Sequence, residues 1–285
     1  MLHTTEGLRL ATTYGNVLVP LDGSREAEAA LGTGEWLARC FGAELHLVTA
    51  AVGAVEQYWY VPYLKTIAGD PITAVPHWID DRDVVAAIKA TARTLEPCVV
   101  CIATHGRSRT AAVLGSTFAQ LAVAGDDPLV AIGPRPSLPG PDPRRTVVCL
   151  GRGPLSVLSA RLIDRAAMWA RAFDHRLTLV TVAGSDDRPT AEDQVQRLAA
   201  DPGIDDLEVD HRVLDDLGGP HSAIARHLGE APATFLATAT HGRTGASRAL
   251  LGSETARIIH HSPIPVLVVP PPPPPPPPTG QRSTI

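Results

Sequence analysis

The sequence predicts an α/β protein built from two doubly wound (Rossmann-like) domains, each with a parallel sheet covered by helices on both faces. Two observations lead to this class. Short runs rich in β-branched residues alternate with helical patterns, as in the crossover units of parallel sheets. The stretch "ATHGRTGASRALLGS" at residues 239–253 also nearly repeats "ATHGRSRTAAVLGS" at residues 103–116. The chain is therefore predicted to be a tandem repeat, and its length suits two domains of ordinary size.

Matching strands are predicted in both halves. Three pairs of short apolar runs correspond: "VLVP" from Val17 and "VVCL" from Val147, "ELHLVTA" from Glu44 and "RLTLVTVAG" from Arg176, and "PLVAI" from Pro128 and "PVLVV" from Pro265. Between the first two strands of each half, apolar or small residues recur at helical spacing over residues 27–41 and 162–173. Ser24, which precedes the first of these patterns, is expected to be its N-cap.

Proline-rich segments mark the predicted domain boundaries. The prolines of residues 135–145 forbid a continuing helix or central strand, so this segment is predicted to link domains at residues 13–134 and 146–270. Residues 270–278 are nine consecutive prolines. The tail at residues 271–285 is expected to be disordered, with its prolines forming an extended rod of about 28 Å at ~3.1 Å per residue. Such a rod is inert by default, or it engages an aromatic-lined groove.

The composition excludes several kinds of partner. A net charge of −5 gives no electrostatic attraction to nucleic acid or to an anionic membrane. The apolar stretches fall far short of the ~20 residues that a membrane-spanning helix needs. The first residues lack the basic and apolar segments of a secretory signal, so a cytoplasmic location is expected. Lysine occurs only at Lys65 and Lys89, so a phosphate-binding side chain would have to be arginine.

Four cysteines raise the question of a metal or redox site. Cys98 and Cys101 form a CxxC motif within "CVVCIA", which has the pattern of a buried strand. Residues three apart on a strand point to opposite faces, and neither a second CxxC nor a histidine lies at ligand spacing. The cysteines are expected to be small buried core residues, and no metal site is predicted.

The repeated glycine stretch is the candidate ligand site. It follows an apolar strand in each half, and ligands of doubly wound sheets bind beyond the carboxyl ends of the strands. In the second half, Gly252 and Ser253 precede "ETARIIH", which is helical in pattern. A Gly-Ser pair at a helix start offers free amides, a hydroxyl and the positive end of the helix dipole, which together suit a phosphate. The stretch is neither a Walker loop nor GxGxxG.

Both halves resemble universal stress protein domains arranged in tandem. The resemblance is carried by "VLVPLDGS", "ATHGR", "LGS" and "PLVAI" in the first half, and by "ATHGRTGASRALLGS" and "SPIPVLVV" in the second. It extends over about residues 17–133 and 146–270. It implies a five-stranded parallel sheet in each half. In many members it also implies ATP binding through the pattern G-x2-G-x9-G-S/T after the fourth strand.

The resemblance assigns the phosphate-binding positions unequally to the two halves. In the second half the pattern lacks only its first glycine, which Ala239 replaces. The remaining positions keep their spacing at Gly242, Gly252 and Ser253. In the first half Ala103 makes the same change, and the loop from Gly106 to Gly115 is one residue shorter. Because one residue spans about 3.3–3.6 Å, the shorter loop cannot hold phosphates in the same way, and the second half is expected to bind nucleotide better.

The resemblance also places the adenosine moiety near the ends of the first two strands. Asp22 stands where the family has an acidic residue against adenosine, whereas the second half has "GRG" at residues 151–153. From the residues alone, Asp22 equally suits a turn before Ser24. Ala50 and Val182 stand where the backbone of family members meets adenine.

The complete set of predicted nucleotide-site residues combines the pattern with the resemblance. It comprises Pro20, Leu21, Asp22, Ala50, Ala103, His105, Gly106, Arg107, Gly115, Ser116, Thr117, Val182, Ala239, His241, Gly242, Arg243, Gly252, Ser253 and Glu254. His105 and His241 are interpreted as loop-ordering residues, since neither has a partner at ligand spacing. Arg107 and Arg243 either pair with phosphates or are solvated. No catalytic residue is assigned.

The sequence favours an ATP-binding regulatory protein, with Mg²⁺ as an optional companion of the nucleotide. Bound ATP would order the glycine loops and change the surface offered to protein partners that the sequence does not identify. Turnover is not expected, because no nucleophile with a base and no paired carboxylates emerge. Two alternatives stay open: a nucleotide-free scaffold whose halves pack as a pseudo-dimer through "PLVAI" and "PVLVV", and a weak ATPase. Formation of a homodimer also stays open. The aromatic-rich insertion at residues 53–70 is a lid, a contact surface or, by default, packing.

Overall fold

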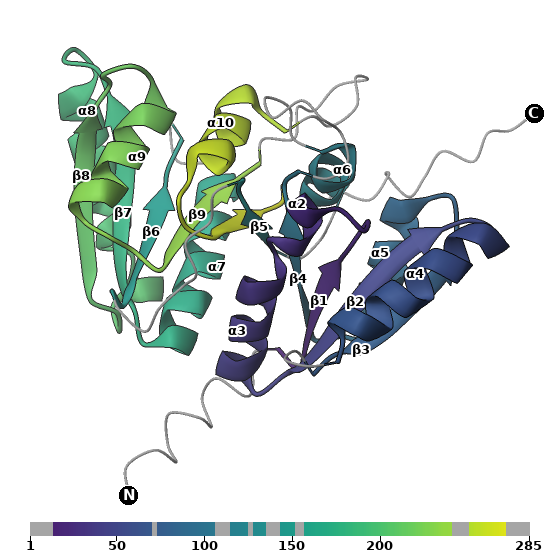
Figure 1. Cartoon of the computed structure of the whole chain (residues 1–285). Helices are drawn as coiled ribbons and strands as arrows, with labels where there is room; N and C mark the ends of the chain where they lie inside the picture. Colours follow the sequence, from purple (N-terminus) through teal and green to yellow (C-terminus); the bar gives the residue numbers. More distant parts are fainter. Residues whose placement is uncertain are drawn as a thin grey trace, which may run out of the picture.

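The chain forms one ten-stranded, mostly parallel sheet with helices on both faces (Figure 1). The computed structural model describes residues 14–69, 73–105, 115–124, 128–134, 143–151, 157–240 and 251–271. The first half contains β1 (Asn16–Pro20), α2 (Arg25–Glu28), α3 (Leu31–Phe41), β2 (Glu44–Ala51), α4 (Ala54–Ile67), β3 (Val75–Asp80), α5 (Val84–Thr94), β4 (Cys98–Ala103), α6 (Ser116–Ala124) and β5 (Leu129–Ile132). The second half contains β6 (Arg145–Cys149), α7 (Val157–Phe173), β7 (Arg176–Ala183), α8 (Arg188–Ala199), the short 3-10 helix η1 (Pro202–Ile204), β8 (Val209–Asp215), α9 (Pro220–Glu230), β9 (Phe235–Ala239), α10 (Ser253–His261) and β10 (Val266–Val269). None of the described helices is long and apolar enough to cross a membrane.

The strand order confirms the predicted class. Across the sheet the order is β3-β2-β1-β4-β5-β10-β9-β6-β7-β8, and each half contributes five strands. Neighbouring strands within a half are parallel, as where Val17 pairs with Leu45 and Thr146 with Leu177. In each half the first strand lies between the second and the fourth strand. The chain connections on its two sides therefore run in opposite directions across the sheet. This is the arrangement in which doubly wound proteins bind ligands beyond the strand ends.

The two halves are joined through their final strands. Strands β5 and β10 pair antiparallel, with Val130 opposite Leu267, as the pseudo-dimer alternative supposed. Both strands are fully buried, and without this pairing each half would expose an open apolar sheet edge. Because the pairing is antiparallel, the carboxyl ends of the two sets of parallel strands lie on opposite edges of the sheet. The two predicted glycine loops therefore follow strands that end on opposite sides of the molecule.

The apolar core is divided by the faces of the sheet and not by the two halves. Alternate residues of a strand point to opposite faces, so Val17 and Leu18 of β1 lie in different clusters. One cluster packs under α3, α4, α7 and α8, and the other under α5, α6, α9 and α10. Each cluster contains residues of both halves, so the halves are expected to unfold together.

An aromatic cluster joins α3 to α7 across the boundary between the halves, where the two helices lie side by side (Figure 1). The rings of Trp36 and Phe173 stack with centroids 5.3 Å apart, and Phe41 meets Phe173 edge-on at 5.2 Å. The side chain of Trp169 is completely buried, and its Nε1 donates a 3.4 Å hydrogen bond to Oη of Tyr14. Aromatic pairs of this kind add about 0.5–1.5 kcal/mol each beyond the area that they bury.

The described residues include four free cysteines, of which two are fully buried. The two cysteines of the CxxC motif are oriented as the strand pattern predicted. Cys98 packs against one apolar cluster and Cys101 belongs to the other, so they point to opposite faces of the sheet. Cys101 and Cys149 are buried, whereas Cys40 and Cys98 are half-buried. Burial raises the pKa of the Cys149 thiol to about 12, and it also raises the pKa of Cys101 and Cys40. These thiols are therefore protonated at neutral pH.

A buried histidine beside the aromatic cluster makes stability depend on pH. His175 is 6% exposed and stacks on Phe173 with ring centroids 5.4 Å apart. Burial, assisted by Arg144, lowers the pKa of His175 from 6.5 to about 4. Below pH 6.5 the unfolded chain binds a proton that the folded protein refuses, so the free energy of unfolding falls as the pH decreases toward 4. One such group contributes about 3 kcal/mol over that interval.

We therefore expect urea midpoints to decrease between about pH 6.5 and pH 4, and His175→Gln to make that decrease shallower. Burial also lowers the pKa of His46, His77 and His227, so the variant is expected to retain part of the slope. Urea unfolding followed by circular dichroism at several pH values measures the effect. An identical slope in the variant and the parent would contradict the role assigned to His175.

Candidate functional site

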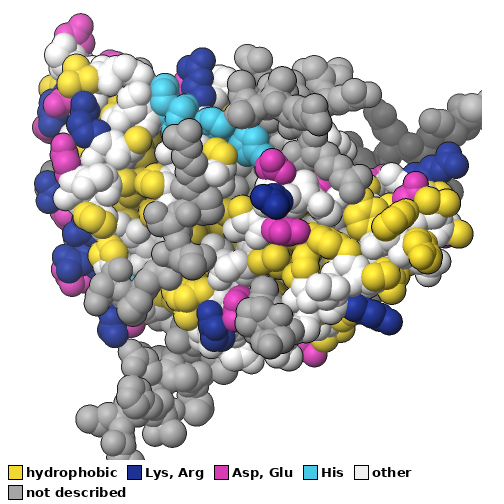
Figure 2. All heavy atoms as spheres, viewed as in Figure 1, with side chains coloured by type: hydrophobic (Ala, Val, Ile, Leu, Met, Phe, Trp, Pro, Cys, Tyr) yellow, Lys and Arg dark blue, Asp and Glu magenta, His cyan; other side chains and the backbone are white. Residues whose placement is uncertain are grey.

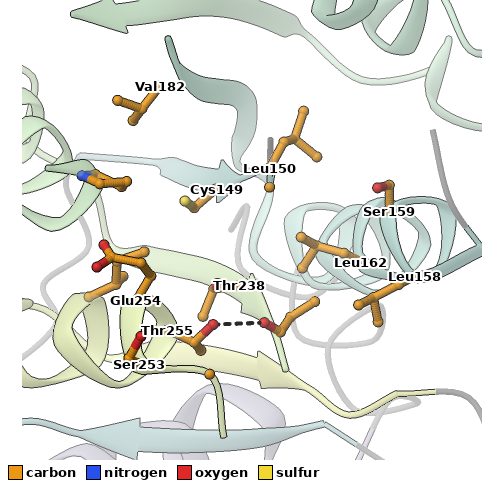
Figure 3. Close-up of a pocket in the computed structure, with 15 residues that line it drawn as sticks. Cys149, Leu150, Leu158, Ser159, Leu162, Val182, Thr238, Ser253, Glu254 and Thr255 are labelled. Atoms are coloured by element: carbon orange, nitrogen blue, oxygen red, sulfur yellow. Dashed lines mark hydrogen bonds between the residues drawn. The ribbon is translucent and has the colours of Figure 1, made fainter. Parts of the chain in front are cut away.

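A cavity of about 390 Å³ opens at the carboxyl edge of the second half's strands (Figure 3). Its volume lies within the range of small-molecule sites, which is roughly 300–1,000 Å³. It is formed by the ends of β6, β7 and β9 together with helices α7, α9 and α10. The lining residues are Cys149, Leu150, Gly151, Leu158, Ser159, Leu162, Val182, Pro220, Thr238, Ala239, Gly252, Ser253, Glu254, Thr255 and Ile258.

The cavity has an apolar wall and a polar end. The apolar wall consists of Leu158 and Leu162 of α7 together with Cys149, Leu150 and Val182, at or just after the ends of β6 and β7 (Figure 3). The polar end is made by the first turn of α10, which presents Ser253, Glu254 and Thr255. A ligand with a flat apolar part and an anionic part would therefore find a suitable surface for each.

The first turn of α10 has the geometry of an anion site. Gly252 is the N-cap residue and no side chain caps the helix, so its first amides are not satisfied by a capping side chain. The positive end of the helix dipole adds to the attraction of these amides for an anion. The hydroxyl of Thr255 donates a 3.2 Å hydrogen bond to the carbonyl of Ala239, which fixes the helix start against the end of β9.

Glu254 supplies a carboxylate at this end of the cavity. Its Oε1 accepts a 3.0 Å hydrogen bond from Arg257, and its Oε2 lies 3.8 Å from Nδ1 of His221. His221 in turn stacks on His261, and the histidines of α9 and α10 form a visible group on the surface (Figure 2). Neither Oε2 of Glu254 nor Nδ1 of His221 makes a hydrogen bond within the described residues. The carboxylate thus brings one buried acceptor atom without a hydrogen bond to this end of the cavity.

The first half uses the corresponding residues differently. Asp22 follows β1, and its Oδ1 accepts hydrogen bonds from the backbone N (2.9 Å) and hydroxyl (2.5 Å) of Ser24. Ser24 is the N-cap of α2, as predicted, and its Oγ accepts a bond from the amide of Ala27. The Asp22 carbonyl accepts a 3.1 Å bond from Oη of Tyr60, so α4 lies against this turn. The carboxylate of Asp22 therefore shapes the turn before α2, which is the simpler of its two interpretations.

The start of α6 is also engaged in the first half. The amide of Gly115 donates a 2.8 Å hydrogen bond to the carbonyl of Thr104, and a Cβ at Gly115 would lie 3.4 Å from that oxygen. His105 follows β4, with its Nδ1 2.8 Å from Oγ1 of Thr104. The ring of His105 lies 5.1 Å from the ring of His260 on α10, so it contacts the other half of the molecule.

The structure brings together five of the predicted site residues, all in the second half. Val182, Ala239, Gly252, Ser253 and Glu254 line the same cavity. The predicted first-half residues occupy the ends of β1, β2 and β4 and the start of α6, at Pro20, Leu21, Asp22, Ala50, Ala103, His105, Gly115, Ser116 and Thr117. The remaining predicted residues lie outside the described part of the chain; they are Gly106, Arg107, His241, Gly242 and Arg243.

Sequence reasoning missed the residues of α7 that form the apolar wall. Leu158, Ser159 and Leu162 line the cavity because α7 follows the loop after β6 and begins at the same edge of the sheet. Cys149 and Leu150 were also missed, although they occupy the positions that match Pro20 and Leu21 of the first half. Applying the repeat in both directions would have found that pair. Within the described residues, no group of three or more His, Cys, Asp or Glu side chains could hold a metal ion.

The fold and the cavity define a tandem doubly wound protein with a ligand-sized site at the carboxyl edge of its second half. The model of the Universal stress protein family matches residues 13–66 and 144–270, which is more than half of the sequence, and the chain belongs to this family. In the first half the match ends well before residue 133, the limit of the expected resemblance, although all five strands are present. No curated protein matches the sequence.

Solved structures share the fold over nearly the whole chain. A universal stress protein from Archaeoglobus fulgidus is 17% identical, with a TM-score of 0.63, over 90% of this chain and 98% of its own. A protein of unknown function from Pseudomonas aeruginosa is 15% identical, with a TM-score of 0.65, over 93% of this chain and 95% of its own. A further structure described as a universal stress protein, from another Pseudomonas aeruginosa strain, is 16% identical with a TM-score of 0.64, over 92% and 95%. At this identity the likeness establishes the tandem fold.

Proposed function

We propose that the second half binds an adenine nucleotide, ATP with or without Mg²⁺, and that the protein acts as a regulator of the universal stress type. The observation that supports this is the two-part cavity, in which an apolar wall faces a helix start with no capping side chain. Those two surfaces suit a flat base and a chain of phosphates, respectively. The resemblance assigned Gly252, Ser253 and Val182 to such a ligand, and all three line the cavity.

In this proposal each part of the nucleotide meets a defined group of residues. The base would lie along the apolar wall of Cys149, Leu150 and Val182, and the phosphates would accept hydrogen bonds from the first amides of α10 and from Ser253. Charge-assisted hydrogen bonds of this kind are the stronger class. Glu254 stands beside the phosphates, where a divalent cation between carboxylate and phosphate would relieve their repulsion. Mg²⁺ is accordingly expected to strengthen ATP binding.

Binding alone is the proposed activity. Glu254 is the one carboxylate among the described lining residues, and it is engaged with Arg257. An ATPase would need a group that orients water toward the phosphates, and the described lining supplies no second acid for that role. The alternative of a nucleotide-free scaffold gains support from the paired final strands and the shared core, which would hold the halves together without a ligand.

Titration of nucleotide-stripped protein with labelled ATP and Mg²⁺ tests the proposal. Saturable micromolar binding without release of phosphate is expected. Steady release of phosphate that disappears in Gly252→Asp would favour the weak ATPase. Absence of binding would favour the scaffold, and nucleotide that copurifies with the protein would support the binding proposal independently.

Asp22→Ala is expected to leave ATP affinity almost unchanged, within about twofold. The Asp22 carboxylate is occupied by Ser24 and lies in the half that carries no part of the proposed site. Loss of this turn is expected to lower the free energy of unfolding by about 1 kcal/mol. Calorimetry with ATP and urea unfolding measure the two effects, and Asp22→Asn, which keeps the Oδ1 acceptor, is the matched control. A large loss of affinity in Asp22→Ala alone would move the proposed site to the first half.

A further inference from the structure

Helix α4 is apolar on two opposite faces. On its inner face Leu64 is 1% exposed, and Tyr63 and Ile67 pack with it against the core under the sheet. The outer face carries Val55, Tyr58, Trp59 and Pro62. Their spacing of i, i+3, i+4 and i+7 places them on one side of the helix. Apolar faces of helices are normally buried, whereas the outer face of α4 is exposed.

Exposed hydrophobic side chains concentrate on α4 and just before its first residue. The structure has six exposed large hydrophobic residues within its described part, and four of them are Val52, Val55, Tyr58 and Trp59. Tyr58 is 72% and Trp59 67% exposed. Figure 2 shows hydrophobic side chains gathered on the side of the molecule where Figure 1 places α4. A contiguous apolar group of this kind marks an interaction surface, whereas scattered single residues do not.

The aromatic rings of Tyr58 and Trp59 contact each other nearly at a right angle. Tyr58 and Trp59 lie 5.5 Å apart, centroid to centroid, and their planes are inclined by 86°. Only Glu56 and Lys65 carry charge on α4, so the surface does not select a charged peptide. Aromatic surfaces of low charge bind polyproline segments, because proline rings pack on flat aromatic faces and the polyproline helix loses little entropy on binding.

The chain carries such a segment in the nine prolines at residues 270–278. Strand β10 ends at Val269, beside β5, and β2, against which α4 packs, lies four strand positions away in the sheet order. At ~4.8 Å per strand this separation is roughly 19 Å across the sheet. The path to Tyr58 and Trp59 is longer than this, because β10 ends at the edge of the sheet opposite to the one where α4 begins. The proline run spans about 28 Å when extended, and residues 279–285 follow it. The run is therefore long enough for its last prolines to reach α4 of the same chain.

We propose that the prolines beyond Pro271 dock on the outer face of α4 of their own chain, with proline rings packed against Tyr58 and Trp59. The surface of α4 is then a contact surface, one of the roles left open for the insertion at residues 53–70, and the proline run is its ligand. This interaction is independent of nucleotide binding, since neither element contributes a described residue to the second-half cavity.

The test compares the full chain with a variant in which residues 272–278 are replaced by glycine and serine at unchanged length. Acrylamide quenching of tryptophan fluorescence is expected to be stronger in the variant, because Trp59 becomes accessible. The same replacement in a Trp59→Phe background is the matched control and is expected to give no difference. Binding of a synthetic nine-proline peptide, followed by NMR, is expected to be about tenfold tighter for the variant than for the full chain, since the tethered segment competes at millimolar effective concentration.

Each outcome decides the proposal. Equal quenching in the full chain and the variant, or equal peptide affinity, would overturn it by showing that the tail leaves α4 open. Peptide binding that survives both Tyr58→Ala and Trp59→Ala would place the peptide elsewhere and also overturn it. A quenching difference that vanishes on dilution would mean that the segment docks on a second copy, which overturns docking within one chain. All these side chains are exposed, so the variants are expected to fold.

Discussion

Gly252→Asp is expected to weaken ATP binding by about 30- to 150-fold, equivalent to about 2–3 kcal/mol, without lowering the stability of the protein. The backbone of Gly252 has φ −59° and ψ 143°, which any residue adopts. A Cβ there would approach nothing closer than Oγ1 of Thr255, at 3.9 Å. Aspartate is also a favourable N-cap residue. Its carboxylate would take the first amides of α10 and repel phosphate from the place where the proposed function needs it.

Two further substitutions of Gly252 separate the effect of charge on ATP affinity from the effect of side-chain size. Gly252→Ala adds only a methyl group, in ordinary van der Waals contact with Oγ1 of Thr255, and we expect it to keep nearly all ATP affinity. Gly252→Asn caps the helix without a charge, so we expect a loss between those of the other two variants. Isothermal calorimetry with ATP and Mg²⁺ gives the affinities, and thermal unfolding reports the stability. If Gly252→Asp binds ATP as tightly as the parent protein, the phosphates do not lie at α10.

The sequence was sufficient to predict the features that depend on local pattern. The short apolar runs at Val17, Glu44 and their repeats became parallel strands, and Ser24 became an N-cap because its hydroxyl lies three residues before a free amide. The Gly-Ser pair at residues 252–253 became the start of a helix. The family resemblance then assigned Val182 and Ala239 to the site, and both line the cavity. Local rules were enough for the strands and the helix starts, whereas Val182 and Ala239 required the resemblance.

The features that depend on contacts between residues far apart in the sequence were harder to predict. The predicted continuous helix over residues 27–41 is divided into α2 and α3, because the chain turns at Ala29 and Ala30. The apolar wall from α7 could not be read from a motif, since Leu158 and Leu162 also suit a core position. His105 contacts His260 of the other half, a pairing that exists only because β5 and β10 run antiparallel. The apolar runs that form β5 and β10 do not indicate whether these strands pair parallel or antiparallel.

Removal of the Trp169 side chain is the second large effect that we expect. Trp169→Ala should lower the free energy of unfolding by about 3–5 kcal/mol, because a completely buried indole would leave a cavity. Its ring lies 5.7 Å from Phe41 and 5.1 Å from Phe235, centroid to centroid, so the cavity would open between α3 of one half and the sheet of the other. Since typical domains are stable by only about 5–15 kcal/mol, this loss is a large fraction of the total.

Because the two halves share one core, the loss of stability in Trp169→Ala is expected to affect both halves together. Urea unfolding followed by circular dichroism is expected to show one transition for the parent protein and one, at lower urea, for Trp169→Ala. Leu217→Ala is the control, because it truncates a large hydrophobic side chain that is 63% exposed and lies in neither proposed binding surface, and it is expected to change stability by about 0.5 kcal/mol or less. Two separate transitions, with only the second-half transition moved by Trp169→Ala, would contradict a core common to both halves. In that event the antiparallel pairing of β5 and β10 would be the main connection between two independently stable units, and disrupting it at Val130 or Leu267 would be expected to separate them.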